Sequence, residues 1–449
     1  MTHNETNFFL RFTHFIIYMD VELLIVQYSL EDSPLLPRAL SRLLHCPVPS
    51  AEAASRFCQY LQSKDPPQTR FLEACKSGKL CILQWLTHEF QLTGKDVRAY
   101  DNEVFRFAAK YGHLHILQWL TDEFRLTGED ARAEFNMAFL LASENGHLEV
   151  LQWLTHEFKL TRDDLRAYDN CEFRGAAHSG HLEILKWLTH AFNMTGVDAR
   201  AKGNYAFRHA AENGHVEVLQ WLTQEFNMTG VEARAYNNYA FRNAAEEGHV
   251  EVLRWLTHEF QLTAEDARAK GNDAFRWAAE AGHLQVLQWL KDEFKLTAED
   301  ARAKGNSAFR NAAEEGHVEV LRWLTHEFQL TGVDARAQGN YAFRVAASHG
   351  HLQVLQWLTQ EFQLTGEDAR AEGNYAFHWA AGNGHLQVLQ WLTQEFQLTG
   401  EDARAGPNDA FRWAACTGHL QVLRWLKEEF KLTGADARAQ DNFAFRWAA

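Results

Sequence analysis

Apolar and polar positions follow one pattern along most of this chain, and the pattern repeats every 34 residues. The dipeptide Trp-Leu marks each unit and recurs eleven times without an insertion, at Trp85, Trp119, Trp153, Trp187, Trp221, Trp255, Trp289, Trp323, Trp357, Trp391 and Trp425. A fixed period of this length is typical of solenoids, in which one supersecondary unit is stacked many times. Because a unit this short cannot bury its own apolar face, we expect neighbouring units to bury it.

The unit that begins at Asn204 predicts two helices joined by a glycine. Residues 204–214 predict a short first helix, with Asn204 as its N-cap and Gly214 as its left-handed C-terminal stop. Residues 216–226 predict an amphipathic second helix, because its apolar side chains recur at helical spacing, at Val218, Leu219, Leu222 and Phe226.

The connection after the second helix predicts a third, very short helical turn. Thr229 is followed three residues later by Glu232, which resembles a capping box. Arg234 follows that acid, and we expect such arginines to make charge-assisted hydrogen bonds within or between these corners. No segment alternates with period two over any length, so the fold class is predicted to be all-α.

The chain therefore predicts two parts. Residues 68–449 form the array, with about eleven full repeats and a C-terminal half repeat that ends at Trp447 and lacks a second helix. That ending is compatible with a truncated gene model, a fragment or a dimer contact. Residues 1–67 carry no repeat and six of the seven prolines, and we expect a mostly helical cap or adaptor segment there.

The repeated string resembles the ankyrin repeat. Its matching positions in one unit are Ala210, Ala211, Gly214, His215 and Leu222. The variant, with F-x-L-T-x-E-D-A-R between units, looks like ankyrin arrays of amoeba-infecting giant viruses and protists. The resemblance implies a curved, right-handed α-solenoid that binds proteins in its concave groove. Arg208 replaces the family's histidine and the unit has 34 residues rather than 33, so we expect a tighter, more helical corner than the family's β-hairpin finger.

Two repeated residue types offer chemistry beyond packing. Zinc requires three or four ligands that converge at about 2.0–2.3 Å, whereas the histidines of adjacent units are expected to lie about 8–10 Å apart. The resemblance instead implies that His215 and its equivalents tie the helix start to nearby backbone. The tryptophan column could stack bases of single-stranded nucleic acid, but it adjoins the apolar stripe, so we expect core or half-core packing.

Positions that vary between units are the candidate contact sites. They follow the capping Asn or precede the paired alanines, and the resemblance places them on the concave face, at Tyr205, Tyr239, Asp273, Tyr341, Tyr375, Asp409, His209, Trp277, Trp379 and Trp413. Tyr and Trp commonly anchor interfaces. The competing interpretations are packing against the next unit, for the site before the alanines, and solvent-exposed drift, for the site after the cap.

We therefore expect a scaffold that binds a partner protein and performs no catalysis, with no cofactor and no metal. Fifty-nine acidic against 44 basic residues give a net charge of −15, which disfavours nucleic acid and favours a partner with a basic patch. No apolar run is long enough for a spanning helix and no secretion signal is evident, so we expect a cytoplasmic monomer without membrane contact, nuclear access being left open. The alternatives are a ubiquitin-ligase adaptor that docks through residues 1–67, or an enzyme whose site lies in that segment.

Overall fold

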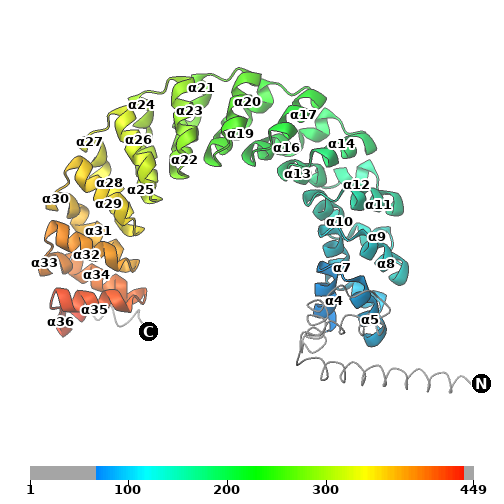
Figure 1. Ribbon diagram of the computed structural model, residues 1–449, viewed down its shortest axis with the longest axis horizontal. Coiled ribbons are helices and arrows are strands. Elements are labelled where there is room, and N and C mark those ends of the chain that lie inside the picture. The colour runs from blue at the N-terminus through cyan, green and yellow to red at the C-terminus, as the bar shows by residue number, and fades with distance from the viewer. Residues whose placement is uncertain (1–66, 439–449) are drawn as a thin grey trace, which may run out of the picture. The chain divides into compact units, whose positions relative to one another are not determined.

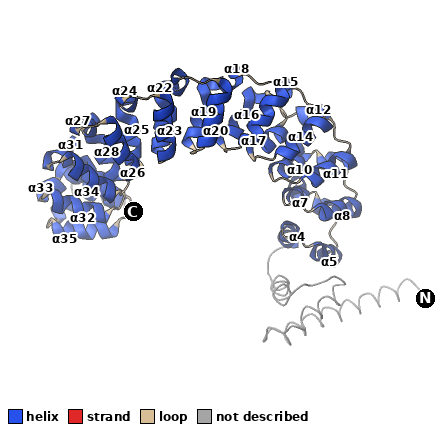
Figure 2. Cartoon of the chain, turned by 45° about the horizontal axis from the view of Figure 1, so that its top comes forward, coloured by secondary structure: helices blue, strands red, loops and turns tan. Residues whose placement is uncertain are grey.

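A computed structural model describes residues 67–438, and every regular element in this range is a helix (Figures 1 and 2). The all-α prediction is thereby confirmed, and no strand occurs between residues 67 and 438, so the corner is helical there, as expected. The predicted cap or adaptor segment, residues 1–67, lies outside the described residues except for Pro67. The predicted half repeat contains Trp447, and its residues after Arg438 also lie outside the described residues.

The chain divides into two compact units, with the boundary between Met194 and Thr195. In each unit a repeat consists of a first helix, a second helix and a short corner helix. The first helices of unit 1 are α4 (Pro67–Lys76), α7 (Ala99–Lys110), α10 (Ala133–Glu144) and α13 (Cys171–His178). Its second helices are α5 (Leu80–Phe90), α8 (Leu114–Phe124), α11 (Leu148–Phe158) and α14 (Leu182–Ala191). Its corner helices are α6 (Gly94–Val97), α9 (Gly128–Ala131) and α12 (Arg162–Arg166).

Unit 2 continues the same plan. Its first helices are α16 (Ala201–Glu212), α19 (Ala235–Glu246), α22 (Ala269–Glu280), α25 (Ala303–Glu314), α28 (Ala337–Ser348), α31 (Ala371–Gly382) and α34 (Ala405–Cys416). Its second helices are α17 (Val216–Phe226), α20 (Val250–Phe260), α23 (Leu284–Phe294), α26 (Val318–Phe328), α29 (Leu352–Phe362), α32 (Leu386–Phe396) and α35 (Leu420–Glu429). Its corner helices are α15 (Gly196–Ala199), α18 (Gly230–Ala233), α21 (Ala264–Ala267), α24 (Ala298–Ala301), α27 (Gly332–Ala335), α30 (Gly366–Ala369), α33 (Gly400–Ala403) and α36 (Gly434–Ala437).

The core is built by contacts between one repeat and the next. Phe207 of α16 is fully buried, and its ring packs against Trp255 and edge-on against Phe260, both of α20, the second helix of the next repeat. Burying a Phe or Leu side chain contributes about 1.5–3 kcal/mol, and the same contact recurs along the array. All eleven tryptophans of the repeated column are buried or half-buried, so the prediction of core or half-core packing is confirmed.

Paired alanines such as Ala210 and Ala211 are buried between the first helices. Small side chains at these positions let neighbouring first helices pack more closely than neighbouring second helices do. Unit 2 by itself therefore curves, with its first helices on the inner side of the stack (Figure 1). We call this the inner side.

Candidate partner-binding surface

An arginine and an acid link successive corners. In one such pair, Arg302 donates from Nε and Nη2 to the two carboxylate oxygens of Asp334, at 2.7 and 3.0 Å. The same carboxylate accepts from the backbone N–H of Thr331, which completes the predicted capping box. Hydrogen bonds from Arg302 outweigh the opposing effect of burial and lower the pKa of Asp334 to about 2. The expected charge-assisted hydrogen bonds are confirmed, and they run between corners.

We call this series the corner ladder. Its described pairs join Arg98–Asp130, Arg132–Asp164, Arg200–Glu232, Arg234–Asp266, Arg268–Asp300, Arg302–Asp334, Arg336–Asp368, Arg370–Asp402 and Arg404–Asp436. Each pair repeats the same closest contact, from the arginine Nε to a carboxylate oxygen of the acid in the next corner.

The prediction that the asparagine caps its own helix is wrong, because its side chain bonds to the next corner. The Asn238 side chain donates from Nδ2 to the backbone carbonyl of Asp266, 3.0 Å away in the next corner, and its Oδ1 does not accept from an N–H of its own helix as an N-cap would. Its backbone is left-handed and is the last of three successive left-handed residues, as in Lys304, Gly305 and Asn306. Gly and Asn tolerate this conformation best, so the recurrent Gly-Asn pairs were a signal of this turn.

The arginine that replaces the family's histidine supports the left-handed turn. Arg310 donates from Nε to the Gly305 carbonyl at 2.9 Å and from Nη2 to the Lys304 carbonyl at 3.1 Å. A guanidinium has the fork of donors that two adjacent carbonyls require. The residue that follows the turn, Ser307 in this repeat, begins the right-handed part of α25, whose range includes the turn.

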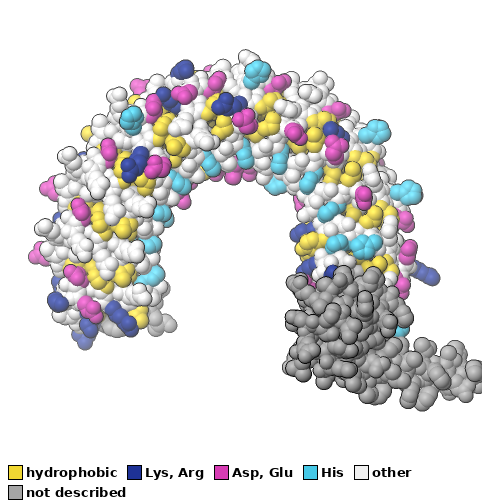
Figure 3. All heavy atoms as spheres, in the orientation of Figure 1, with side chains coloured by type: hydrophobic (Ala, Val, Ile, Leu, Met, Phe, Trp, Pro, Cys, Tyr) yellow, Lys and Arg dark blue, Asp and Glu magenta, His cyan; other side chains and the backbone are white. Residues whose placement is uncertain are grey.

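The histidines of the Gly-His pairs also make structural contacts between repeats. In His113, His147 and His181 the ring Nε2–H donates to a backbone carbonyl near the end of the preceding first helix, at 2.9–3.0 Å. Burial lowers the pKa of His147. Histidines line the inner edge of unit 2 in Figure 3, and no cluster of potential metal ligands occurs among residues 67–438.

The candidate residues of the first repeats in unit 2 contact one another. The rings of Tyr205 and His209 lie 3.8 Å apart, and His209 also faces Tyr239 of the next first helix. Glu212 joins them, because its carboxylate accepts from the Tyr239 hydroxyl at 3.2 Å and lies 2.7 Å from Nδ1 of His209. These residues and their equivalents on the first helices of unit 2 are called the inner row, which comprises Tyr205, His209, Tyr239, Asp273, Trp277, Tyr341, Tyr375, Trp379, Asp409 and Trp413.

Tyr341 and Tyr375 extend the row and lie beneath arginines that hold the left-handed turns. The Arg310 guanidinium is 4.9 Å from the Tyr341 ring, and that of Arg344 is 5.2 Å from the Tyr375 ring. These are cation–π distances. Each arginine therefore makes two contacts. Its N–H groups donate to the carbonyls of the turn, and the face of its guanidinium stacks on the tyrosine ring.

The last part of the row is the most accessible. Tyr375, Trp379 and Trp413 are 41, 42 and 47% exposed. The two tryptophan rings stack with an interplanar angle of 12° and centroids 6.4 Å apart, and Tyr375 packs against Trp379. An exposed cluster of three large aromatic side chains is unusual on a protein surface unless it contacts something else.

Asp273 and Trp277 are different, because their own chain covers them. Asp273 is only 8% exposed and is paired with Arg242 and Arg276, while Arg242 lies over the Trp277 ring. Asp273 therefore offers almost no surface to a partner, and its assignment as a contact residue is wrong, because Arg242 of the preceding repeat and Arg276 cover its carboxylate. Asp409, at the equivalent place in α34, is half-buried and pairs with Arg412.

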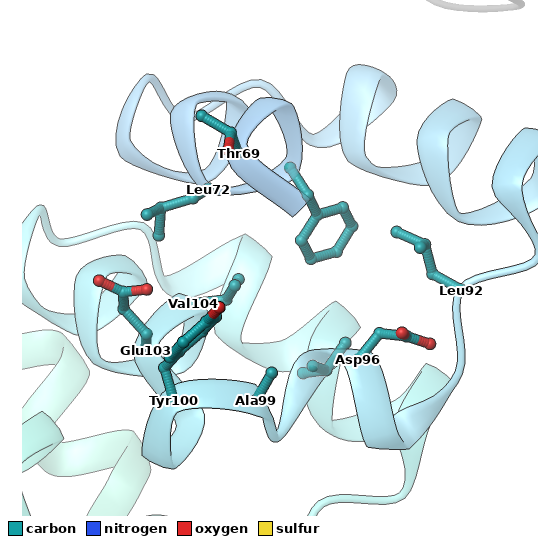
Figure 4. Close-up of a pocket in the computed structure, with 10 residues that line it drawn as sticks. Thr69, Leu72, Leu92, Asp96, Ala99, Tyr100, Glu103 and Val104 are labelled. Atoms are coloured by element: carbon teal, nitrogen blue, oxygen red, sulfur yellow. The ribbon is translucent and has the colours of Figure 1, made fainter. Parts of the chain in front are cut away.

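A separate cavity of about 240 Å³ lies in unit 1 and includes none of the candidate residues (Figure 4). It opens between α4 and the start of α7, and apolar residues such as Leu72, Leu92 and Val104 form much of its wall. Its Asp96 is already engaged in a capping box with Thr93.

No described helix is both long and apolar enough to cross a membrane.

Comparison with known proteins identifies the repeat. A family model for ankyrin repeats (three copies) matches four overlapping stretches, residues 173–266, 241–338, 275–368 and 343–441, which together cover more than half of the chain. A search of curated proteins found no match. The repeat geometry and the sequence match agree, and the chain belongs to the ankyrin-repeat family.

Proposed function

We propose that this protein is an interaction scaffold that binds a partner protein along the inner row of unit 2. Ankyrin repeats generally mediate protein–protein interaction, and their fold is typically a non-catalytic scaffold. The observation that carries the proposal is the exposed aromatic cluster of Tyr375, Trp379 and Trp413, on a molecule whose repeated apolar positions are buried. Such side chains act as interface anchors when a partner removes them from water.

The net charge of −15 supports a partner with a basic patch. Charge of this kind steers association and raises its rate more than it selects one target. The aromatic cluster and the varied inner row would then provide the selection.

The test is capture of partners from the native cell with the whole chain as bait. Replacing Tyr205, Tyr239, Tyr341 and Tyr375 together by alanine is expected to abolish capture of the specific partner. The matched control replaces four exposed second-helix residues, Gln224, His258, Asp292 and His326, by alanine, and is expected to leave capture unchanged. Equal capture by the two variants would reject the inner row as the binding surface.

A further inference from the structure

Two repeats of unit 2 carry the same three residues at the same positions. α22 has Asp273, Arg276 and Trp277, and α34 has Asp409, Arg412 and Trp413. In both helices the aspartate pairs with the arginine three residues later, at 2.5 Å in α22 and 2.6 Å in α34. The two sites can therefore be compared directly within one molecule.

The site on α22 binds a guanidinium from its own chain. Arg242 of the preceding first helix donates from Nη1 to Asp273 Oδ2 at 3.0 Å, and its Cζ lies 4.8 Å from the centre of the Trp277 ring. The guanidinium is thus hydrogen-bonded to a carboxylate and stacked on an indole, two interactions that reinforce each other. Arg242 is only 7% exposed, so this receptor is filled and closed.

At the site on α34 the corresponding residue is His378 of α31. It is 6% exposed, and its Nε2 has no hydrogen-bond partner among the described residues. Burial lowers the pKa of His378, although Asp409 and the backbone of Asp402 act in the opposite direction.

The aspartate and the tryptophan of α34 are more exposed than those of α22. The Asp409 side chain is 30% exposed against 12% for Asp273, and Trp413 is nearly half exposed. Gly382 stands where α19 has Glu246, and a Cβ at this glycine would come within 3.0 Å of the Trp413 Cβ. The ring therefore lies directly against the end of α31, with its position set by that glycine.

We propose that Asp409 and Trp413 bind the guanidinium of an arginine side chain supplied by the partner protein. The inference rests on the proposed function and gives the partner's chemistry: a basic segment with an accessible arginine. Arginine fits better than lysine, because a planar guanidinium donates in its plane to the carboxylate while its face stacks on the ring. The pairing of Asp409 with Arg412 does not block the site, since Asp273 holds Arg276 and Arg242 together.

The test uses the full chain and two short probes, N-acetyl-Gly-Arg-Gly-amide and N-acetyl-Gly-Lys-Gly-amide. Binding is followed in every variant by isothermal titration calorimetry, and in chains that keep Trp413 also by the indole N–H resonance of this residue in a nuclear magnetic resonance titration, assigned with Trp413→Phe. We expect the arginine probe to shift this resonance and to bind more tightly than the lysine probe. Asp409→Asn and Trp413→Ala should each weaken its binding about five-fold or more, whereas Trp277→Ala should not.

A second variant tests the site without removing either receptor group. His378→Arg recreates the arrangement of Arg242, so its guanidinium should occupy the site and abolish binding of the arginine probe. Asn383→Arg adds the same charge at the exposed end of the same helix and should leave most of the binding intact. This control separates occupation of the site from simple charge repulsion.

Three results would each overturn the inference: equal binding of the two probes, unchanged binding in Asp409→Asn and Trp413→Ala, or unchanged binding in His378→Arg. The probes require no partner, so the outcome is independent of the capture experiment. If the arginine probe binds as expected but the tyrosine variant still captures the partner, the arginine site stands and the four tyrosines are excluded as partner contacts.

Discussion

The corner ladder and the inner row lie in the same repeats and follow opposite rules. Each described rung of the ladder has an arginine and an acid with closest N···O distances of 2.6–2.8 Å. The inner row changes from Tyr341 to Tyr375 to Asp409, and from covered Trp277 to open Trp413. The difference shows that stacking energy is carried by identical contacts, while side chains that leave those contacts intact are free to vary.

The largest effect should come from protonating the whole ladder. Although burial acts in the opposite direction, hydrogen bonds from arginine and threonine lower the pKa of six ladder acids to about 2, at Asp164, Glu232, Asp300, Asp334, Asp402 and Asp436. The folded pKa is depressed, so this stability is present above the unfolded value near 4 and is lost as the pH falls through about 2. With about 1 kcal/mol per pair, allowing for the partly exposed arginines, helical circular dichroism should collapse between pH 4 and 2. A helix content that is unchanged at pH 2 would argue against the ladder.

Removing one rung should have the next largest effect. Asp300→Ala removes the partner of Arg268, the acceptor of the Thr297 N–H and a contact of Asn272. Because several donors then lose their acceptor, we expect a loss of about 3 kcal/mol in the free energy of urea unfolding. The neighbouring Glu299→Ala is the control, since Glu299 is exposed, and it should cost less than about 0.5 kcal/mol. Equal losses would show that position, rather than pairing, matters.

One repeat has an ionisable residue at a core position that is apolar in the next repeat. Glu172 stands where the next repeat has the buried Ala206, and neither carboxylate oxygen has a hydrogen-bond partner in residues 67–438. Burial raises its pKa to about 7, so the folded state loses stability as the pH rises from the unfolded value near 4.5 through 7. Glu172→Ala should therefore stabilise the protein by about 2 kcal/mol at pH 8 and by less at pH 4. Urea unfolding at both pH values measures this, with exposed Glu149→Ala as the control, and a loss of stability at pH 8 would contradict it.

The left-handed turn should give a smaller effect. Gly305 has a φ of +67°, and Ala at this position should cost about 1 kcal/mol because its Cβ is crowded in that conformation. Gly305→Asn should cost less, since Asn237 occupies the equivalent position with a φ of +58°. Thermal unfolding of the two variants measures the difference. An equal loss of stability in both would show that backbone strain does not set the preference for Gly or Asn at this position.

The smallest effect on stability is expected in the inner row. Tyr341→Ala loses a half-buried ring beneath Arg310 and should change the free energy of unfolding by only about 0.5 kcal/mol. Urea unfolding of this variant gives the measure. A loss above about 2 kcal/mol would mean that the inner row also holds the array together.

Local signals in the sequence were sufficient for the helices, for the capping box of the corner and for the C-terminal stop of the first helix. Thr229 and Glu232 predicted the capping box, and Gly214 predicted the left-handed stop, because both depend on residues within one turn of the chain. The asparagine was different. Its hydrogen-bond acceptor lies 28 residues away in the next corner, so no local pattern around Asn238 could distinguish that contact from an N-cap.

The sequence by itself determined that helical units repeat and stack, since a constant period places the same apolar side chains against the same neighbours at every step. Only the tertiary structure decided which variable positions remain open. Trp277 and Trp413 follow the same residues along the chain, yet Arg242 lies over the Trp277 ring, whereas Trp413 stacks on Trp379 and is 47% exposed. The physical reason is that accessibility belongs to a pair of adjacent repeats, and a side chain is covered or open according to what its neighbour in space supplies.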